Sequence, residues 1–160
     1  MSPALALTLM LKVITYDNAF ARTGDGPFVV LVAYAEKDRA AADEVVAAAE
    51  QLQQKAILRR PLSFVAVRAE DVTAKVPELK ASAVLAPSGA PPALVKELTR
   101  VAAAARIYSM AMDAERVDEG IALGVGQAGG KPQLIINVAA ARAAGCDFQP
   151  SVLKIAKTVQ

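Results

Sequence analysis

The sequence contains no histidine and only one cysteine, Cys146. Without histidine, the chain cannot build a Ser-His-Asp or Cys-His catalytic arrangement, or a zinc site with imidazole ligands. A lone cysteine cannot form a disulfide within the chain or, by itself, a thiolate metal site, so we expect Cys146 to be a buried, inert thiol. The sequence therefore predicts no metal site, no cofactor and no catalytic residue. If the protein were nevertheless an enzyme, its carboxylates or the Cys146 thiol would have to carry the reaction.

Aromatic residues make up only 4% of the chain, whereas 54% of its residues are hydrophobic, so the core must be largely aliphatic. The net charge is only +2 and the charges are interspersed, which argues against a nucleic-acid-binding surface, because such a surface needs a concentrated basic stripe. Arg59-Arg60 is the only basic doublet, and we expect it in a solvated loop. A length of 160 residues predicts a single domain, residues 1–160.

The first fifteen residues are strongly apolar, yet they lack the basic start and the small-residue cleavage site of an export signal. They are also too short to cross a bilayer, so we do not expect a membrane-spanning segment here. Ser2-Pro3 favours the start of a helix, with serine as the cap and proline at the first helical position. We expect a helix whose broad apolar face is covered by the rest of the domain or lies at a subunit interface.

Apolar runs and helical patterns alternate along the rest of the chain. Strands are expected at Phe28–Ala35, Leu62–Val67, Ala81–Ala86 and Arg106–Ala111. Helices are expected from Asp38 to about Ala56, at Glu70–Leu79, from Pro91-Pro92 onward, and from Pro150 with Leu153, Ala156 and Val159 facing inward. Continuous apolar strands that alternate with helices predict a three-layer α/β fold, with a mostly parallel sheet and helices on both faces.

The last third of the chain predicts an antiparallel hairpin at one edge of this sheet. Two apolar runs, Ile121–Val125 and Leu134–Val138, flank the turn Gly129–Gly130. The glycines between Gly124 and Gly129 also match the G-x-G-x-x-G pattern of dinucleotide-binding proteins. That motif needs a helix directly after its glycines, and here Lys131-Pro132 and a strand follow, so we favour the hairpin.

In open α/β sheets, ligands bind beyond the carboxyl ends of the strands. The polar side chains that could line a small-ligand site are Tyr16, Asp17, Ser88, Tyr108, Ser109 and Asn137. Several have a structural alternative: Tyr16 as a core residue with a satisfied hydroxyl, Asp17 as a turn residue, and Asn137 as the cap of the helix after it. Ser88 has no candidate base beside it, so helix capping or turn formation is the preferred explanation for this residue.

The two ends of the chain carry a distinctive pattern. It consists of Lys12–Asn18 before a glycine-containing turn, then Asp118–Val125, Gly129–Pro132, Ile136–Gly145 and Leu153–Val159. On these stretches the chain resembles the YfiR-like family, and the likeness extends over essentially the whole chain, with a thin part from about Arg39 to Ser82.

The resemblance implies a periplasmic bacterial regulator that is not an enzyme. The best-understood members of the family bind the periplasmic sensor domain of an inner-membrane diguanylate cyclase and hold the cyclase off, which keeps cyclic di-GMP low. Other members accompany membrane sensor kinases or outer-membrane receptors, and members are often dimeric. For this chain the resemblance thus implies a membrane-bound signalling partner and a homodimer; the alternative is a small-ligand-binding sensor or an accessory protein. The disulfides of the characterised regulator have no counterpart in a chain whose only cysteine is Cys146.

Overall fold

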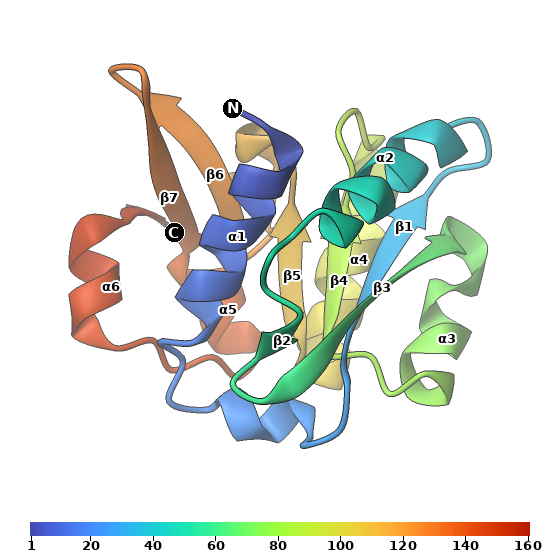
Figure 1. The fold of residues 1–160 in the computed structure, drawn as a ribbon, viewed down its shortest axis with the longest axis horizontal. Coiled ribbons are helices and arrows are strands. Elements are labelled where there is room, and N and C mark those ends of the chain that lie inside the picture. The colour runs from blue at the N-terminus through green and yellow to red at the C-terminus, as the bar shows by residue number, and fades with distance from the viewer.

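The computed structural model describes all residues from Met1 to Gln160, and it contains one eight-stranded sheet with the order β2-β3-β1-β4-β5-β6-β7-β8 (Figure 1). The strands are β1 (Phe28–Tyr34), β2 (Ala56–Ile57), β3 (Arg60–Arg68), β4 (Ala83–Ala86), β5 (Tyr108–Ala111), β6 (Leu123–Ala128), β7 (Lys131–Asn137) and β8 (Lys157–Val159). The pairs β2–β3 and β6–β7 are antiparallel, and all other neighbours are parallel. The predicted mostly parallel sheet is confirmed.

Helices cover both faces of the sheet, which confirms the predicted three layers. They are α1 (Pro3–Ile14), α2 (Arg39–Glu50), α3 (Val72–Glu78), α4 (Pro92–Ala105), α5 (Val138–Ala143) and α6 (Pro150–Ile155), with short 3-10 turns at Phe20–Thr23, Ala69–Asp71 and Ala114–Arg116. Because side chains alternate along a strand, β1 serves two cores. Val30 and Val32 pack with α1 and α2, whereas Leu31 and Ala33 pack with α3 and α4.

Helix α1 begins as predicted, because the Ser2 hydroxyl accepts a hydrogen bond from the Leu5 N–H at 3.2 Å and Pro3 occupies the first turn. Its apolar face is covered: Leu7, Met10 and Ile14 are fully buried against the sheet. In Figure 1, α1 runs along the face of the sheet beside β6. Of the two expected alternatives for this helix, the structure therefore shows the covered one.

The β6–β7 hairpin is also confirmed, with Gly129 and Gly130 at φ values of 58° and 76°. Both values lie in the region that favours glycine, as a two-residue hairpin turn requires. The end of the chain differs from its prediction. Helix α6 stops at Ile155, Ala156 is extended, and β8 pairs with β7, so Val159 lies in a strand and does not continue the inward face of a helix.

The segment after α2 also differs. The helix ends at Glu50, well before Ala56, because β2 and β3 form a second hairpin whose turn residues Leu58 and Arg59 have positive φ. The expectation of a solvated Arg59-Arg60 loop is wrong for Arg60, which is only 5% exposed.

The Arg60 guanidinium turns inward and is satisfied without a carboxylate. It donates to the Gly26 carbonyl at 2.7 Å, to the Thr23 hydroxyl at 2.7 Å and to the Ser82 hydroxyl at 2.8 Å. It also lies over the rings of Phe20 and Phe28, whose faces attract a cation. Arg60 thereby fastens the start of β3 to the segment that precedes β1.

Candidate functional site

A buried carboxylate, Asp17, is the centre of a polar cluster at the end of α1. Its Oδ1 accepts the backbone N–H groups of Ala19 at 2.9 Å and Asp147 at 2.8 Å. Its Oδ2 accepts the Tyr108 hydroxyl at 2.5 Å and an Arg22 N–H at 2.6 Å. Asp17 therefore joins the chain after α1, the first residue of β5 and the chain after α5.

Arg22 completes this cluster from the 3-10 turn Phe20–Thr23. Besides Asp17, its guanidinium donates to the carbonyl oxygens of Ala19 at 2.8 Å and Ala144 at 3.0 Å, and to Cys146 Sγ at 3.1 Å. It also lies 4.7 Å from the centre of the Tyr108 ring. The cation is thus held by a carboxylate, two carbonyls, a sulfur and an aromatic face.

These contacts decide the charges of the cluster at neutral pH. Burial by itself would raise the pKa of Asp17, but the hydrogen bonds from Tyr108, the two backbone N–H groups and Arg22 outweigh it and lower that pKa below its usual 3.8. Burial raises the pKa of Tyr108, and the bond to Asp17 raises it further. Burial also raises the pKa of the Cys146 thiol to about 12, although Arg22 opposes this. Asp17 and Arg22 are therefore an ion pair, and the hydroxyl and the thiol stay protonated.

Backbone contacts extend the cluster into what we call the clasp, residues 16–22 and 144–149 together with Tyr108. The Asn18 N–H donates to the Asp147 carbonyl at 2.8 Å, and the Gln149 N–H donates to the Tyr16 carbonyl at 3.0 Å. Asp17 and Phe148 form an isolated antiparallel bridge. The clasp therefore ties the segment after α1 to the segment between α5 and α6.

The clasp lies at the amino ends of the parallel strands, because Tyr108 is the first residue of β5 and the 3-10 turn with Arg22 precedes β1 (Figure 1). Sequence reasoning named Asp17 and Tyr108 but missed Arg22 as a partner of Cys146. The two residues are 124 positions apart, and no spacing rule connects them.

Ser109 and Asn137 meet elsewhere, at a cavity of about 320 Å³ between α4, α5 and the end of the chain. The Asn137 amide is occupied by the fold: its oxygen accepts the Ala140 N–H at 2.9 Å, and its nitrogen donates to the Val117 carbonyl at 2.9 Å. Asn137 is thus the predicted cap of α5. The Ser109 hydroxyl accepts the Ala122 N–H at 2.8 Å, and its own hydrogen has no acceptor in the chain. Ser109 therefore has one free donor at this cavity.

Ser88 stands apart from the other candidates. It is exposed in the loop after β4, next to the point where the strand order reverses between β1 and β4. That position is the usual ligand crevice of an open α/β sheet. Here the space between Tyr34, Asp38 and Ser88 is too small to admit a water-sized molecule. The six candidate residues consequently occupy three places: Tyr16, Asp17 and Tyr108 at the clasp, Ser109 and Asn137 at the cavity, and Ser88 alone.

None of the helices combines the length and the apolar character needed to cross a bilayer. Among solved structures, the fold resembles a ligand-free, open substrate-binding protein with adhesive properties from Clostridium difficile, with a TM-score of 0.65 and 12% identity, over 100% of this chain and 60% of that one. It also resembles an ABC domain in complex with L-Trp from Streptococcus pneumonia, with a TM-score of 0.63 and 14% identity, over 99% and 61% of the two chains.

A conserved domain protein from Vibrio cholerae matches with a TM-score of 0.61 and 12% identity, over 99% of this chain and 60% of that one. The chain therefore spans about 60% of the length of each of these proteins, and identities this low show a shared fold only. No curated protein matches the sequence.

A family model described as YfiR/HmsC-like matches residues 15–157. This range contains the whole clasp and the cavity residues Ser109 and Asn137. The two stretches on which the resemblance depends, at the start and in the last third of the chain, are the ones that the clasp joins in space. The chain belongs to the YfiR/HmsC-like family.

Proposed function

We propose that this protein is a non-enzymatic periplasmic regulator that binds the sensor domain of an inner-membrane diguanylate cyclase and holds the cyclase inactive. The observation that carries the proposal is membership of the YfiR/HmsC-like family over residues 15–157. The chemistry of the clasp supports it, because burial raises the pKa values of Tyr108 and Cys146. Both side chains are therefore protonated at neutral pH, and neither is an activated nucleophile or base. A domain of this kind would act through its surface.

Regulation by docking has a quantitative requirement. A binding protein shifts a two-state partner only by its differential affinity for the two states. To move a cyclase from almost fully active to almost fully inactive, the protein must bind the inactive state about ten-thousandfold more tightly. The rigid, doubly covered sheet provides a surface that does not itself need to rearrange.

The test has two arms in the native organism. Tagged protein recovered from detergent-solubilised membranes is expected to retain a membrane cyclase, identified by mass spectrometry, and deletion of the gene is expected to raise cyclic di-GMP. If a sensor kinase or an outer-membrane receptor is retained and cyclic di-GMP is unchanged, the protein is still a regulator, but its partner is that kinase or receptor and not a cyclase. Recovery of no membrane signalling protein or receptor, together with unchanged cyclic di-GMP, would contradict the proposal.

A second function, a sensor of a small ligand, is favoured by the cavity at Ser109. The free hydroxyl hydrogen could donate to a ligand acceptor, and Asn137 lines the same space of about 320 Å³. Two of the fold neighbours are a substrate-binding protein and a domain in complex with L-Trp, which supports a small-molecule role. Under this proposal Ser109 and Asn137 contact the ligand, and Tyr16, Asp17, Ser88 and Tyr108 would need a different site.

A thermal-shift screen of metabolites, including L-Trp, tests the sensor. A ligand at a hundred times its Kd stabilises the folded state by about 2.7 kcal/mol, which is a readily measured shift. Ser109→Ala is expected to weaken the effect, whereas Ser88→Ala, at an exposed serine away from the cavity, is the matched control. A screen without a stabilising compound would contradict this second function.

We also propose that the protein is a homodimer, as its family resemblance implies. Solution mass measures this directly and independently of any membrane partner.

A further inference from the structure

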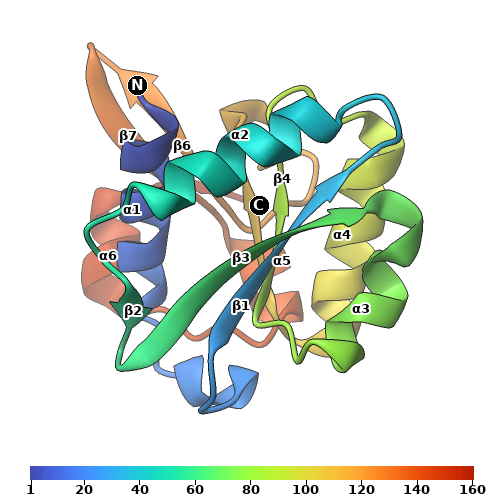
Figure 2. The same ribbon diagram turned by 45° about the vertical axis from the view of Figure 1, so that its right-hand side comes forward.

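The outer side of β3 is largely open. Strand β2 pairs only with Arg60 and Pro61, and the Leu62 N–H donates to the Lys55 carbonyl at 2.9 Å. From residue 63 to Arg68, β3 has β1 on one side and no strand on the other (Figure 2). Alternate residues of a strand direct their backbone groups to the same side. Because Leu62 donates outward, Phe64, Ala66 and Arg68 also present their N–H and C=O groups to the open side.

The middle of this open edge, between Pro61 and Arg68, lacks the features that normally prevent strands from pairing with other chains. Residues 62–67 (LSFVAV) contain no charge, no proline and no glycine, and all but Val67 are only half-buried. Proteins usually protect such edges with charged residues, proline or a covering element. An uncharged, β-prone edge of this kind is therefore a template for another strand.

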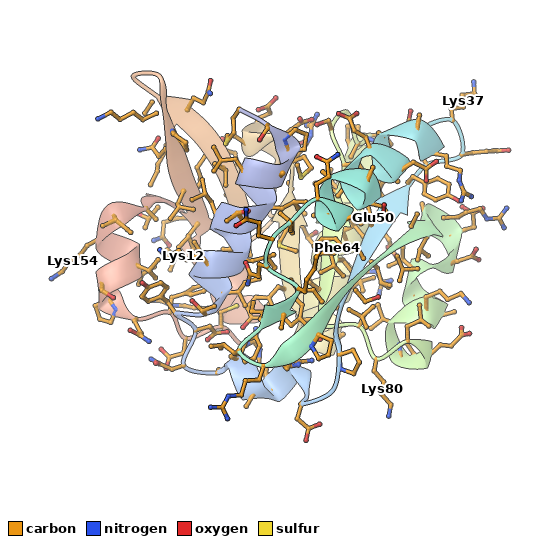
Figure 3. All side chains as sticks on the ribbon, viewed as in Figure 1. Lys12, Lys37, Glu50, Phe64, Lys80 and Lys154 are labelled. Atoms are coloured by element: carbon orange, nitrogen blue, oxygen red, sulfur yellow. The ribbon has the colours of Figure 1, made fainter.

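An apolar groove of about 220 Å³ continues this edge toward α2. Leu62 and Phe64 line it from β3, and Val46 and Glu50 line it from α2. Figure 3 shows Phe64 close to Glu50, near the carboxyl end of α2. A strand added to β3 would therefore bury apolar side chains as well as satisfy backbone groups.

We propose that β3 pairs in antiparallel fashion with β3 of a second copy of this chain. The inference rests on the homodimer proposed above and assigns its interface. The free, outward-facing residues are Phe64, Ala66 and Arg68, so the two-fold axis passes at Ala66. Ala66 then lies opposite Ala66 of the second copy, and Phe64 lies opposite Arg68 of the second copy. This register forms about six main-chain hydrogen bonds.

The charges at the two ends of the open edge favour a second copy over a strand of unrelated sequence. Exposed Lys55 and Arg59 lie at the amino end of the edge. Glu70 and Asp71 lie at its carboxyl end, where both contact Arg68 of their own chain at 3.3 Å, so that this end keeps one net negative charge. Antiparallel pairing brings the acidic end of one copy to the basic end of the other, with Glu70 next to Lys55 of the second copy. It also places Arg68, which pairs with Glu70 and Asp71 of its own chain, opposite the aromatic Phe64 of the second copy.

The first test breaks the backbone pairing. Ala66→Pro removes an outward N–H that has no partner within the chain, so the fold should persist, whereas the dimer loses its central hydrogen bonds. Wild type is expected to sediment as a dimer and Ala66→Pro as a monomer with an unchanged circular dichroism spectrum. Ala66→Val, which keeps the N–H and suits a strand, is the matched control and should remain a dimer.

The second test reverses the end charges and does not depend on the proline variant folding. Lys55→Glu and Glu70→Lys are each expected to raise the dimer Kd about three- to tenfold, and the double variant to restore it. Three results would each overturn the proposal. The wild type could be a monomer at high micromolar concentration, or folded Ala66→Pro could have the same dimer Kd as the wild type. In the third, the dimer Kd of the double variant shows the effects of the two single substitutions added together. If the wild type is a monomer and Ala66→Pro no longer recovers the membrane partner, the β3 edge binds that partner, and the proposed β3–β3 dimer is overturned. The membrane recovery above is a separate measurement, so failure here leaves the proposed regulator untouched.

Discussion

Four donors from three parts of the chain converge on the buried Asp17 carboxylate, so this side chain links segments that are distant in the sequence. Asp17→Asn removes the negative charge and leaves the Arg22 guanidinium, only 12% exposed, without its counter-ion. Loss of one partner of a buried ion pair costs about 3–5 kcal/mol. We expect a fall in the free energy of unfolding near the lower figure, measured by urea denaturation. Asp43→Asn, which breaks the exposed Arg39–Asp43 pair, is the control and should cost less than about 1 kcal/mol.

The same carboxylate predicts a dependence of stability on pH. The pKa of Asp17 in the folded protein lies below its usual value of 3.8, so its ionised form is favoured by folding. The resulting stabilisation is fully present above the unfolded pKa and is lost as the pH falls through the folded pKa. We expect the difference in unfolding free energy between wild type and Asp17→Asn to shrink as the pH is lowered from neutrality past 3.8. A difference that does not change with pH would show that Asp17 acts only by packing.

Cys146 is expected to be unreactive in the folded protein. Because its pKa rises from 9.0 to about 12, the thiolate fraction at mildly alkaline pH falls about a thousandfold. Labelling with a maleimide should therefore be slow in the native state and fast in urea. The exposed thiol of an S151C variant provides an internal standard. If both thiols are labelled at equal rates in the native state, Cys146 is reactive, and a redox or intermolecular role for it would have to be considered again.

Among the secondary-structure elements, β6 depends on one close approach. A Cβ added at Gly124 would lie 2.6 Å from Val117 Cγ2, closer than carbon atoms can pack. Gly124→Ala should therefore displace Val117 and cost about 1–3 kcal/mol, measured by thermal or urea unfolding. Gly26→Ala, where nothing lies within 4 Å, is the matched control and should change stability by less than about 0.5 kcal/mol. Equal effects at both positions would show that backbone freedom, and not contact, decides the role of Gly124.

The elements that the sequence predicts well are those with a local signal. Apolar runs mark β1 and β4, Ser2-Pro3 marks the start of α1, and two adjacent glycines mark the β6–β7 turn. The missed strands β2 and β8 are only two and three residues long, too short for a periodic pattern, and each exists because it pairs with a longer neighbour.

Across the whole molecule, the clasp couples segments at opposite ends of the sequence. Asp17 accepts the Asp147 N–H, so loosening one segment should loosen the other. In Asp17→Asn we expect hydrogen exchange to accelerate more at the amides of residues 144–149 and 16–22 than at those of the α4 core residues Leu98 and Val101, which accelerate only as the global free energy of unfolding falls. Uniform acceleration throughout the protein would indicate global destabilisation instead, and no change at 144–149 would contradict the coupling.

The candidate sites were predictable only in part. Polar character singled out Asp17, Tyr108, Ser109 and Asn137, and the capping role of Asn137 could be read from its place between a strand and a helix. Nothing in the spacing of residues indicated that Asp17 and Tyr108 would meet, or that Ser109 would retain a free donor beside a cavity. These facts arise from packing between segments that are distant in the sequence.

The sequence by itself determined the alternation of covered strands and helices, the glycine hairpin, and the absence of imidazole chemistry, because each depends on residue type or on neighbours a few positions away. Only the tertiary structure decided that Arg60 is buried, that Arg22 reaches Cys146, and that β3 keeps one side open. The physical reason is that the partner of a guanidinium or of a strand edge is chosen by which surfaces the folded layers bring together, and a linear pattern does not contain that information.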